Sequence, residues 1–325
     1  MRKLPPRAHC RARIAAPNPA DVRQAPPPKL LPAVLLAAIL GISISGPLAR
    51  LSTAAPLAIA AWRLTLSMGI ILGLLAATGS WREYRTLSRR DLFIALGAGA
   101  MLALHFWSWI TSITLTTVAA SVVLVNLHPV VIVAGSAIFL HERPTRRQVI
   151  GIAVAMLGAV VVGYGDAGGS GAAPNALAGD LLALLGAATV GVYYLVGRSL
   201  RQRLTLWPYV GLVYGAALSV VLLLAGLSGT PLWPQPTRDL WIFTGIALGP
   251  MMLGHTGFNW SLRYVPAYVV SLAILAEPVG ATLLAAFIPG IAETPSAWTL
   301  AGGAVIIGGL VIGTLGEKAG REDAA

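Results

Sequence analysis

The sequence predicts an all-α integral membrane protein with ten transmembrane helices in two inverted five-helix repeats. Three observations predict this fold class: the composition, a series of long apolar runs, and an internal repeat. Of the 325 residues, 56% are apolar and only 11% are charged, whereas about a quarter of the residues of a soluble domain are charged. The composition therefore excludes an ordinary water-soluble protein.

Ten apolar runs follow one another along the chain, each close to the roughly 20 residues that a helix needs to cross a bilayer. The runs lack the alternation of polar and apolar residues that is typical of membrane β-strands, so helices are expected. The predicted helices are Leu30–Leu48, Pro56–Ala77, Leu92–Thr111, Ala119–Leu140, Gln148–Tyr164, Asp180–Val196, Tyr209–Leu227, Leu240–Leu262, Ala267–Ile288 and Ala297–Leu315.

The basic residues predict the orientation, because Lys and Arg in short loops are retained on the cytoplasmic side. With the amino terminus inside, the inner segments hold 20 of the 23 Lys and Arg residues. The outer loops hold Arg50 and Arg238, and Arg63 lies within the second run. This asymmetry supports ten helices with both termini cytoplasmic. It also explains the net charge of +11 without nucleic acid as a partner.

The segments between and around the runs define the expected organisation. Residues 1–29 are rich in basic residues and proline and predict a flexible cytoplasmic tail. A cleaved signal peptide and a translation start further downstream are the alternatives. The two halves are expected at 30–165 and 180–316, with an outer linker at 166–179 and a second cytoplasmic tail at 317–325. The single cysteine excludes a disulfide within the chain, and no motif predicts a cofactor or a metal site.

The two halves resemble each other, which predicts a repeat. Because each half holds five helices, an odd number, the second must cross the membrane in the opposite sense. Inverted repeats of this kind are typical of secondary transporters. The matching segments are Gly151–Gly158 with Gly302–Gly309, Glu142–Pro144 with Glu293–Pro295, and His128-Pro129 with Glu277-Pro278.

Several segments resemble the EamA-like family of the drug/metabolite transporter superfamily. They are Leu140–Gly151, Asn259–Arg263, Glu277–Val279, Glu293–Pro295 and Gly302. The resemblance extends over Leu30–Gly316 and implies an inner-membrane carrier that exports amino acids or other small metabolites through a cavity between the halves. One joint, Phe287–Glu293, is longer than the family's usual form and contains a proline, so the outer end of the ninth helix is expected to differ.

Two ionisable residues lie near the middle of predicted helices, each directly before a proline: His128 before Pro129, and Glu277 before Pro278. Charged groups at membrane depth are costly and commonly functional. The prolines are expected to kink their helices and to free the carbonyl four residues earlier. His128 and Glu277 are therefore candidates for substrate contact and for proton coupling. Alternatively, they only stabilise the kinks.

Other candidates share helix faces. His105 and Trp109 are four residues apart, as are His255 and Asn259, so each pair projects from one face. These faces are predicted to line a common cavity for a small solute, and helix packing is the alternative.

Two further candidates for substrate contact are Arg63 and Tyr194. Arg63 either pairs with a substrate carboxylate or extends its long side chain to the outer surface. Adjacent residues on a helix point about 100° apart, so at most one of Tyr193 and Tyr194 is expected to reach the cavity.

Helix joints and small-residue pairs are assigned structural roles. Glu142 and Glu293 are expected to cap the helices that follow them. Glycine pairs four residues apart predict close helix packing, either within the bundle or between two copies in a homodimer. They are Gly69/Gly73, Gly211/Gly215, Gly245/Gly249 and Gly309/Gly313.

Together these features predict a secondary transporter that exports a small metabolite by alternating access, with or without proton coupling. The expected partners are a small-molecule substrate and membrane lipid. Two alternatives remain: an intramembrane enzyme that uses Glu277 and His128 as an acid–base pair, and a passive channel.

Overall fold

The computed structural model describes residues 27–116, 121, 124–167, 175–281 and 297–322. Every regular element in these ranges is a helix, which confirms the all-α prediction. Within the described residues, five helices are long and apolar enough to cross a membrane, and three shorter apolar helices accompany them. The five are Leu31–Leu51, Pro56–Thr78, Arg89–Leu115, Leu177–Arg201 and Leu206–Ser228, and the shorter three are His128–Leu140, Ala267–Ala281 and Leu300–Gly313.

The helices follow the predicted runs closely. The first half contains α2 (Leu31–Ser43), α3 (Ser45–Leu51), α4 (Pro56–Thr78), the 3-10 helix η1 (Ser80–Thr86), α5 (Arg89–Leu115), α7 (His128–Gly135), the π-helix η2 (Ser136–Leu140) and α8 (Arg146–Ala167). The second contains α9 (Ala176–Arg201), α10 (Leu206–Ser228), α11 (Thr237–Ile246), the π-helix η3 (Ala247–His255), α12 (Thr256–Ser261), α13 (Ala267–Ile274) and α15 (Ala297–Glu322).

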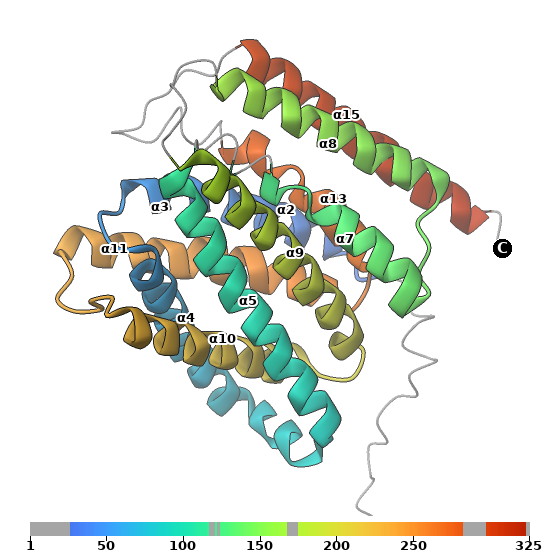
Figure 1. The fold of residues 1–325 in the computed structure, drawn as a ribbon. Coiled ribbons are helices and arrows are strands. Elements are labelled where there is room, and N and C mark those ends of the chain that lie inside the picture. The colour runs from blue at the N-terminus through green and yellow to red at the C-terminus, as the bar shows by residue number, and fades with distance from the viewer. Residues whose placement is uncertain (1–26, 117–120, 122–123, 168–174, 282–296, 323–325) are drawn as a thin grey trace, which may run out of the picture.

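Helices from the two halves pack against each other throughout the bundle. Figure 1 shows α8 and α15 side by side along one edge, with α7 and α13 between this pair and the remaining helices. On the other side, α5 packs against α9 and α10, and α2 packs against η3. Large apolar side chains such as Leu72, Leu157 and Leu223 are more than half exposed, as expected of a surface that faces lipid. The halves thus form one bundle with its core between them.

Glycines bring α8 and α15 into backbone contact. A Cβ atom on Gly151 would lie 2.6 Å from the carbonyl oxygen of Gly309, and one on Gly158 would lie 2.7 Å from that of Gly302. Only glycine permits helix axes to approach this closely. The packing predicted for Gly309 therefore occurs within the bundle. By contrast, no atom lies within 4 Å of the corresponding position on Gly69 or Gly73.

Substitution of Gly309 by alanine is expected to destabilise the protein, because the added methyl would lie 2.6 Å from Ala155 N. Overpacking of this kind typically costs about 1–3 kcal/mol. Gly308 is the matched control, since nothing lies within 4 Å of its Cβ position and alanine favours helix by roughly 0.5–1 kcal/mol. The melting temperature in detergent should fall for Gly309→Ala and hold or rise for Gly308→Ala. Equal falls would contradict the packing described here.

The two X-Pro sites break their helices, whereas the sequence predicted kinks. A two-residue turn at 126–127 precedes α7, and a second turn at 275–276 precedes a helical segment at 277–281. Pro129 therefore lies in the first turn of a new helix, where its missing N–H is not needed. The carbonyl of Val125 is freed as predicted, and the ring Nδ1 of His128 lies 3.2 Å from it. The breaks place His128 and Glu277 at helix starts within the bundle.

The end of α4 recurs at the end of α10, 150 residues later. Each helix ends at a glycine in the left-handed region, Gly79 with φ 65° and Gly229 with φ 66°, a conformation that glycine adopts without strain. The hydroxyls that flank these glycines interact in the same way, Thr78 with Ser80 at 2.8 Å and Ser228 with Thr230 at 2.7 Å. A joint of the first half is thus repeated in the second.

Glu142 does not cap α8, contrary to the prediction. The cap is formed instead by Thr145 and Gln148, each of which accepts a hydrogen bond from the backbone N–H of the other, the reciprocal arrangement of a capping box. Glu142 lies 2.7 Å from Arg198 of α9 in an ion pair, so its carboxylate joins the two halves. Glu293, the counterpart predicted from the repeat, lies outside the described residues.

Candidate functional site

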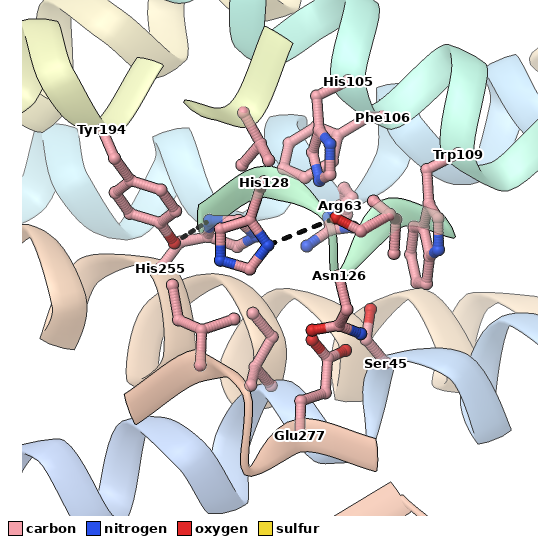
Figure 2. Close-up of a pocket in the computed structure, with 14 residues that line it drawn as sticks. Ser45, Arg63, His105, Phe106, Trp109, Asn126, His128, Tyr194, His255 and Glu277 are labelled. Carbon is pink, nitrogen blue, oxygen red and sulfur yellow. Dashed lines mark hydrogen bonds between the residues drawn. The ribbon is translucent and has the colours of Figure 1, made fainter. Parts of the chain in front are cut away.

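A cavity of about 40 Å³ lies in the core between the two halves (Figure 2). About 10–15 Å³ of such space holds one water molecule, so the cavity has room for a few waters. It is far smaller than the roughly 300–1,000 Å³ of typical ligand pockets. Its walls come from α2, α3, α4, α5, α9 and η3, and from the two helix breaks, one before α7 and one after α13. It is lined by Ile42, Ser45, Arg63, His105, Phe106, Trp109, Val125, Asn126, His128, Val190, Tyr194, His255, Ile274 and Glu277.

Arg63 on α4 is buried at the cavity, with only 1% of its surface exposed. Its guanidinium carbon lies 3.9 Å from the centre of the Phe106 ring, and its Nη2 lies 3.7 Å from Met251 Sδ. Among the described residues it forms no ion pair, and its Nε has no hydrogen-bond partner there. The side chain therefore does not extend to the outer surface. Burying a charge that no carboxylate contacts directly is costly, so this guanidinium is available to an anionic group.

His105 and Trp109 form one aromatic wall on α5. Their rings are parallel within 4°, with centroids 6.2 Å apart. The Nδ1 of His105 lies 3.0 Å from the carbonyl of Gly186 on α9, which fixes the orientation of the imidazole. Trp109 Nε1 is buried and has no hydrogen-bond partner among the described residues. This wall thus offers flat apolar faces and one unused donor.

His255 and Tyr194 form a second aromatic wall. The Tyr194 hydroxyl lies 3.3 Å from His255 Nδ1, and the rings are stacked within 11° at 6.3 Å. His255 also meets Phe106 edge to face at 5.3 Å, which connects the second wall to the first. The cavity is therefore bounded largely by rings, which suit a flat or apolar solute.

Glu277 approaches the cavity from the side opposite to His105. Figure 2 shows its carboxyl group pointing toward Asn126 and Ser45. His128 faces the same space, and its Nε2 is buried without a hydrogen-bond partner among the described residues. The two helix breaks thus supply an acid, an amide and an imidazole to one side of the cavity.

The structure brings together most of the residues that the sequence singled out. Of the eight candidates for substrate contact, seven line the cavity: Arg63, His105, Trp109, His128, Tyr194, His255 and Glu277. Asn259 lies outside the lining, because its amide donates hydrogen bonds to the hydroxyls of Tyr193 and Tyr214. Of the two adjacent tyrosines only Tyr194 lines the cavity, as expected.

Three polar or aromatic lining residues were missed by the sequence analysis: Ser45, Phe106 and Asn126. Asn126 could have been found, since it lies two residues before His128 in the apolar run that the proline interrupts. Phe106 is adjacent to His105 and projects about 100° away from it along an ideal helix, so no periodic signal marked both. Ser45 carries no signal in an alanine- and glycine-rich helix.

Two named relatives are transporters. An uncharacterised transporter of Archaeoglobus fulgidus is 26% identical over 266 residues, which cover 79% of this chain and 88% of the relative. An aromatic amino acid exporter, YddG, of Ancylobacter novellus is 29% identical over 221 residues, which cover 67% of this chain and 74% of the relative. A crystal structure of a protein 23% identical in sequence matches with a TM-score of 0.72 over 88% of this chain and 96% of the other. That likeness shows the fold.

The model of the EamA-like transporter family matches the chain twice, over residues 29–164 and 177–315. The two matches together cover most of the chain, and they correspond to the two halves recognised from the sequence. A family of transporters implies a small-molecule substrate and a multi-pass membrane protein, in agreement with the apolar helices. The chain belongs to the EamA-like transporter family.

Proposed function

We propose that this protein is a carrier that exports a zwitterionic amino acid, aromatic ones included, across the inner membrane by alternating access. The observation that carries the proposal is the buried guanidinium of Arg63, which faces the same cavity as the carboxyl group of Glu277. A substrate carboxylate would give Arg63 the anionic partner that it lacks, since guanidinium and carboxylate form strong paired hydrogen bonds.

The side of the cavity formed by Glu277 and Asn126 suits the amino group of the same substrate. Glu277 and the side-chain oxygen of Asn126 are acceptors, and an ammonium group is a donor only. In this proposal Glu277 binds the ammonium group and takes up a proton, together with His128, when the substrate leaves. The cavity thus offers one cation and one acid, which match the two charges of one zwitterion.

The rings that line the same cavity support an aromatic or apolar side chain in the substrate. Trp109 and His105 present parallel faces, and offset or edge contacts between rings contribute about 0.5–1.5 kcal/mol each. The relative from Ancylobacter novellus is named as an exporter of aromatic amino acids, which favours the same class of substrate here.

The size of the cavity supports a carrier in preference to an open channel. A space of about 40 Å³ admits no amino acid until the walls separate, so binding requires a movement of the helices around it. Such a movement is expected of alternating access.

The contacts of α8 and α15 support two inverted halves of five helices, with ten spans in all. Gly151 meets Gly309 and Gly158 meets Gly302, so the helices run antiparallel. The two halves match at an offset of 151 residues, so Gly151 corresponds to Gly302 and Gly158 to Gly309. Exchange of the two halves therefore converts the first contact into the second. A two-fold axis that exchanges antiparallel helices is perpendicular to them, and therefore lies in the membrane plane.

Counterflow in proteoliposomes tests the substrate. Vesicles loaded with unlabelled phenylalanine should accumulate labelled phenylalanine with saturation, and phenethylamine or phenylpropionate should compete poorly because each lacks one of the two charges. In the same vesicles Glu277→Gln should flatten the pH dependence of exchange. Flux that rises linearly with concentration would indicate a channel. Equal competition by all three compounds would contradict the zwitterion site.

A further inference from the structure

The 3-10 helix η1, between α4 and α5, has an inward side that is fixed to the second half. The carboxylate of Glu83 accepts hydrogen bonds from the backbone N–H and the hydroxyl of Thr205, just before α10. The Tyr84 hydroxyl donates a hydrogen bond of 3.1 Å to the carbonyl of Pro208. These contacts hold the short helix in one orientation, so the residues that it presents outward are also fixed.

The outward side of η1 carries a tryptophan between two arginines. Trp81 is 39% exposed, and the guanidinium carbons of Arg82 and Arg85 lie 5.7 and 5.0 Å from the centre of its ring. Arg89, the first residue of α5, is also exposed and follows η1 in the chain after Leu87 and Ser88. Among the described residues none of these arginines forms an ion pair.

The nearby acidic groups are engaged elsewhere. Glu83 binds Thr205, as described above, and Asp91 pairs with Arg203 at 2.7 Å and with the Ser88 hydroxyl. The outward surface of η1 is therefore a patch of positive charge around an indole ring, with no compensating carboxylate in the described part of the chain.

The joint after α10, which repeats the joint after α4, allows the two arrangements to be compared. Trp233 comes four residues after Gly229, whereas Trp81 comes two residues after Gly79, and Trp233 is 66% exposed. Trp233 is followed by Pro234 and Gln235 where Trp81 is followed by Arg82 and Glu83. Tryptophan suits either membrane interface, so both joints carry it. The joint after α10 and the start of α11 carry one arginine, Arg238, whereas the joint after α4 and the start of α5 carry four, Arg82, Arg85, Arg89 and Arg90. This concentration of positive charge suits a negatively charged partner.

We propose that Trp81, Arg82, Arg85 and Arg89 form a binding site for the headgroup of an anionic phospholipid. The indole lies at the level of the headgroups, and the guanidinium groups bind phosphate oxygens, for which their planar donors are well suited. Basic residues at a membrane surface each contribute attraction to anionic lipids. Because the inward side of η1 is fixed to the start of α10, a bound lipid stabilises the junction between the two halves.

Titration of the full-length protein in detergent with phosphatidylglycerol or phosphatidylcholine of the same acyl chains, followed by native mass spectrometry, tests this site. Arg82→Gln/Arg85→Gln should weaken phosphatidylglycerol binding by roughly 10- to 30-fold and leave phosphatidylcholine binding unchanged. The matched control is Arg146→Gln/Arg147→Gln, which removes two exposed arginines at the start of α8 and should bind as the wild type does.

Three results would overturn the proposal: equal losses in both double variants, no loss in Arg82→Gln/Arg85→Gln, or saturation of the same residues by inorganic phosphate at the affinity of the lipid. A melting temperature within the range of the wild type in lipid-free detergent establishes that each variant is folded. The readout is independent of transport, so the outcome does not depend on the proposed substrate.

Discussion

Replacement of Arg63 by glutamine is expected to abolish amino acid exchange while it raises the stability of the substrate-free protein. Hydrogen bonds to a charged group contribute about 1.5–3 kcal/mol, so loss of the guanidinium should weaken substrate binding roughly 10- to 150-fold. At the same time the substitution removes a buried charge without an ion-pair partner among the described residues, a group that costs several kcal/mol to bury. Loss of the buried contact with Phe106 offsets about 2 kcal/mol of this gain.

The opposite signs of these two effects separate a binding role from a structural one. Melting temperature without substrate and counterflow activity should be measured on the same preparation of Arg63→Gln. Arg63→Lys is the control, since it keeps the charge but lacks the planar pair of donors, and should retain partial exchange. A variant that loses stability together with activity, or one that transports normally, would contradict the role assigned to Arg63.

Replacement of Arg198 by glutamine is expected to open one end of the junction between the halves. Arg198 lies 2.7 Å from Glu142 and donates hydrogen bonds to the carbonyls of Leu262 at 2.6 Å and Arg263 at 3.2 Å. With 13% of its side chain exposed, it is only partly screened by water, so its loss should cost about 1–3 kcal/mol. The arrangement in which Arg198 joins the two halves should then be less populated, and the rate of substrate exchange should change.

Arg203 is the matched control for Arg198. It also forms an ion pair of 2.7 Å, with Asp91, but its side chain is 55% exposed, and exposed pairs contribute about 0–1 kcal/mol. The melting temperature should fall for Arg198→Gln and change little for Arg203→Gln. Equal changes in the two variants would show that the junction does not depend on Arg198.

The helical character and most of the candidate site were predictable from the sequence because they depend on local patterns. Apolar runs fix where helices occur, and a polar group within such a run is conspicuous, as His128 and Glu277 are. The convergence of His105 and His255 on one cavity was expected from the assumption that their helix faces meet in the core.

The remaining features depend on contacts that no local pattern encodes. Arg63 could equally have reached the outer surface, and only the packing of α4 against Phe106 places its charge inside. Asn259 lies one helical turn after His255, but its side-chain amide donates hydrogen bonds to the hydroxyls of Tyr193 and Tyr214 and so does not reach the cavity. Glu142 pairs with Arg198, which is 56 residues away in the sequence, so the capping role predicted from adjacency was wrong.

The central claim is that the two halves cross the membrane in opposite senses. The most direct test is to find on which side of the membrane two equivalent joints lie. In a chain whose single cysteine is removed by Cys10→Ser, Thr86→Cys precedes α5 and Thr237→Cys begins α11; both positions are exposed. Neither substitution changes a basic residue, so the charges that determine orientation are preserved. A membrane-impermeant maleimide applied to intact cells should label position 237 and not 86, and inverted vesicles should give the reverse. Labelling of both thiols from the same side would contradict the inverted arrangement and, with it, the proposed mechanism.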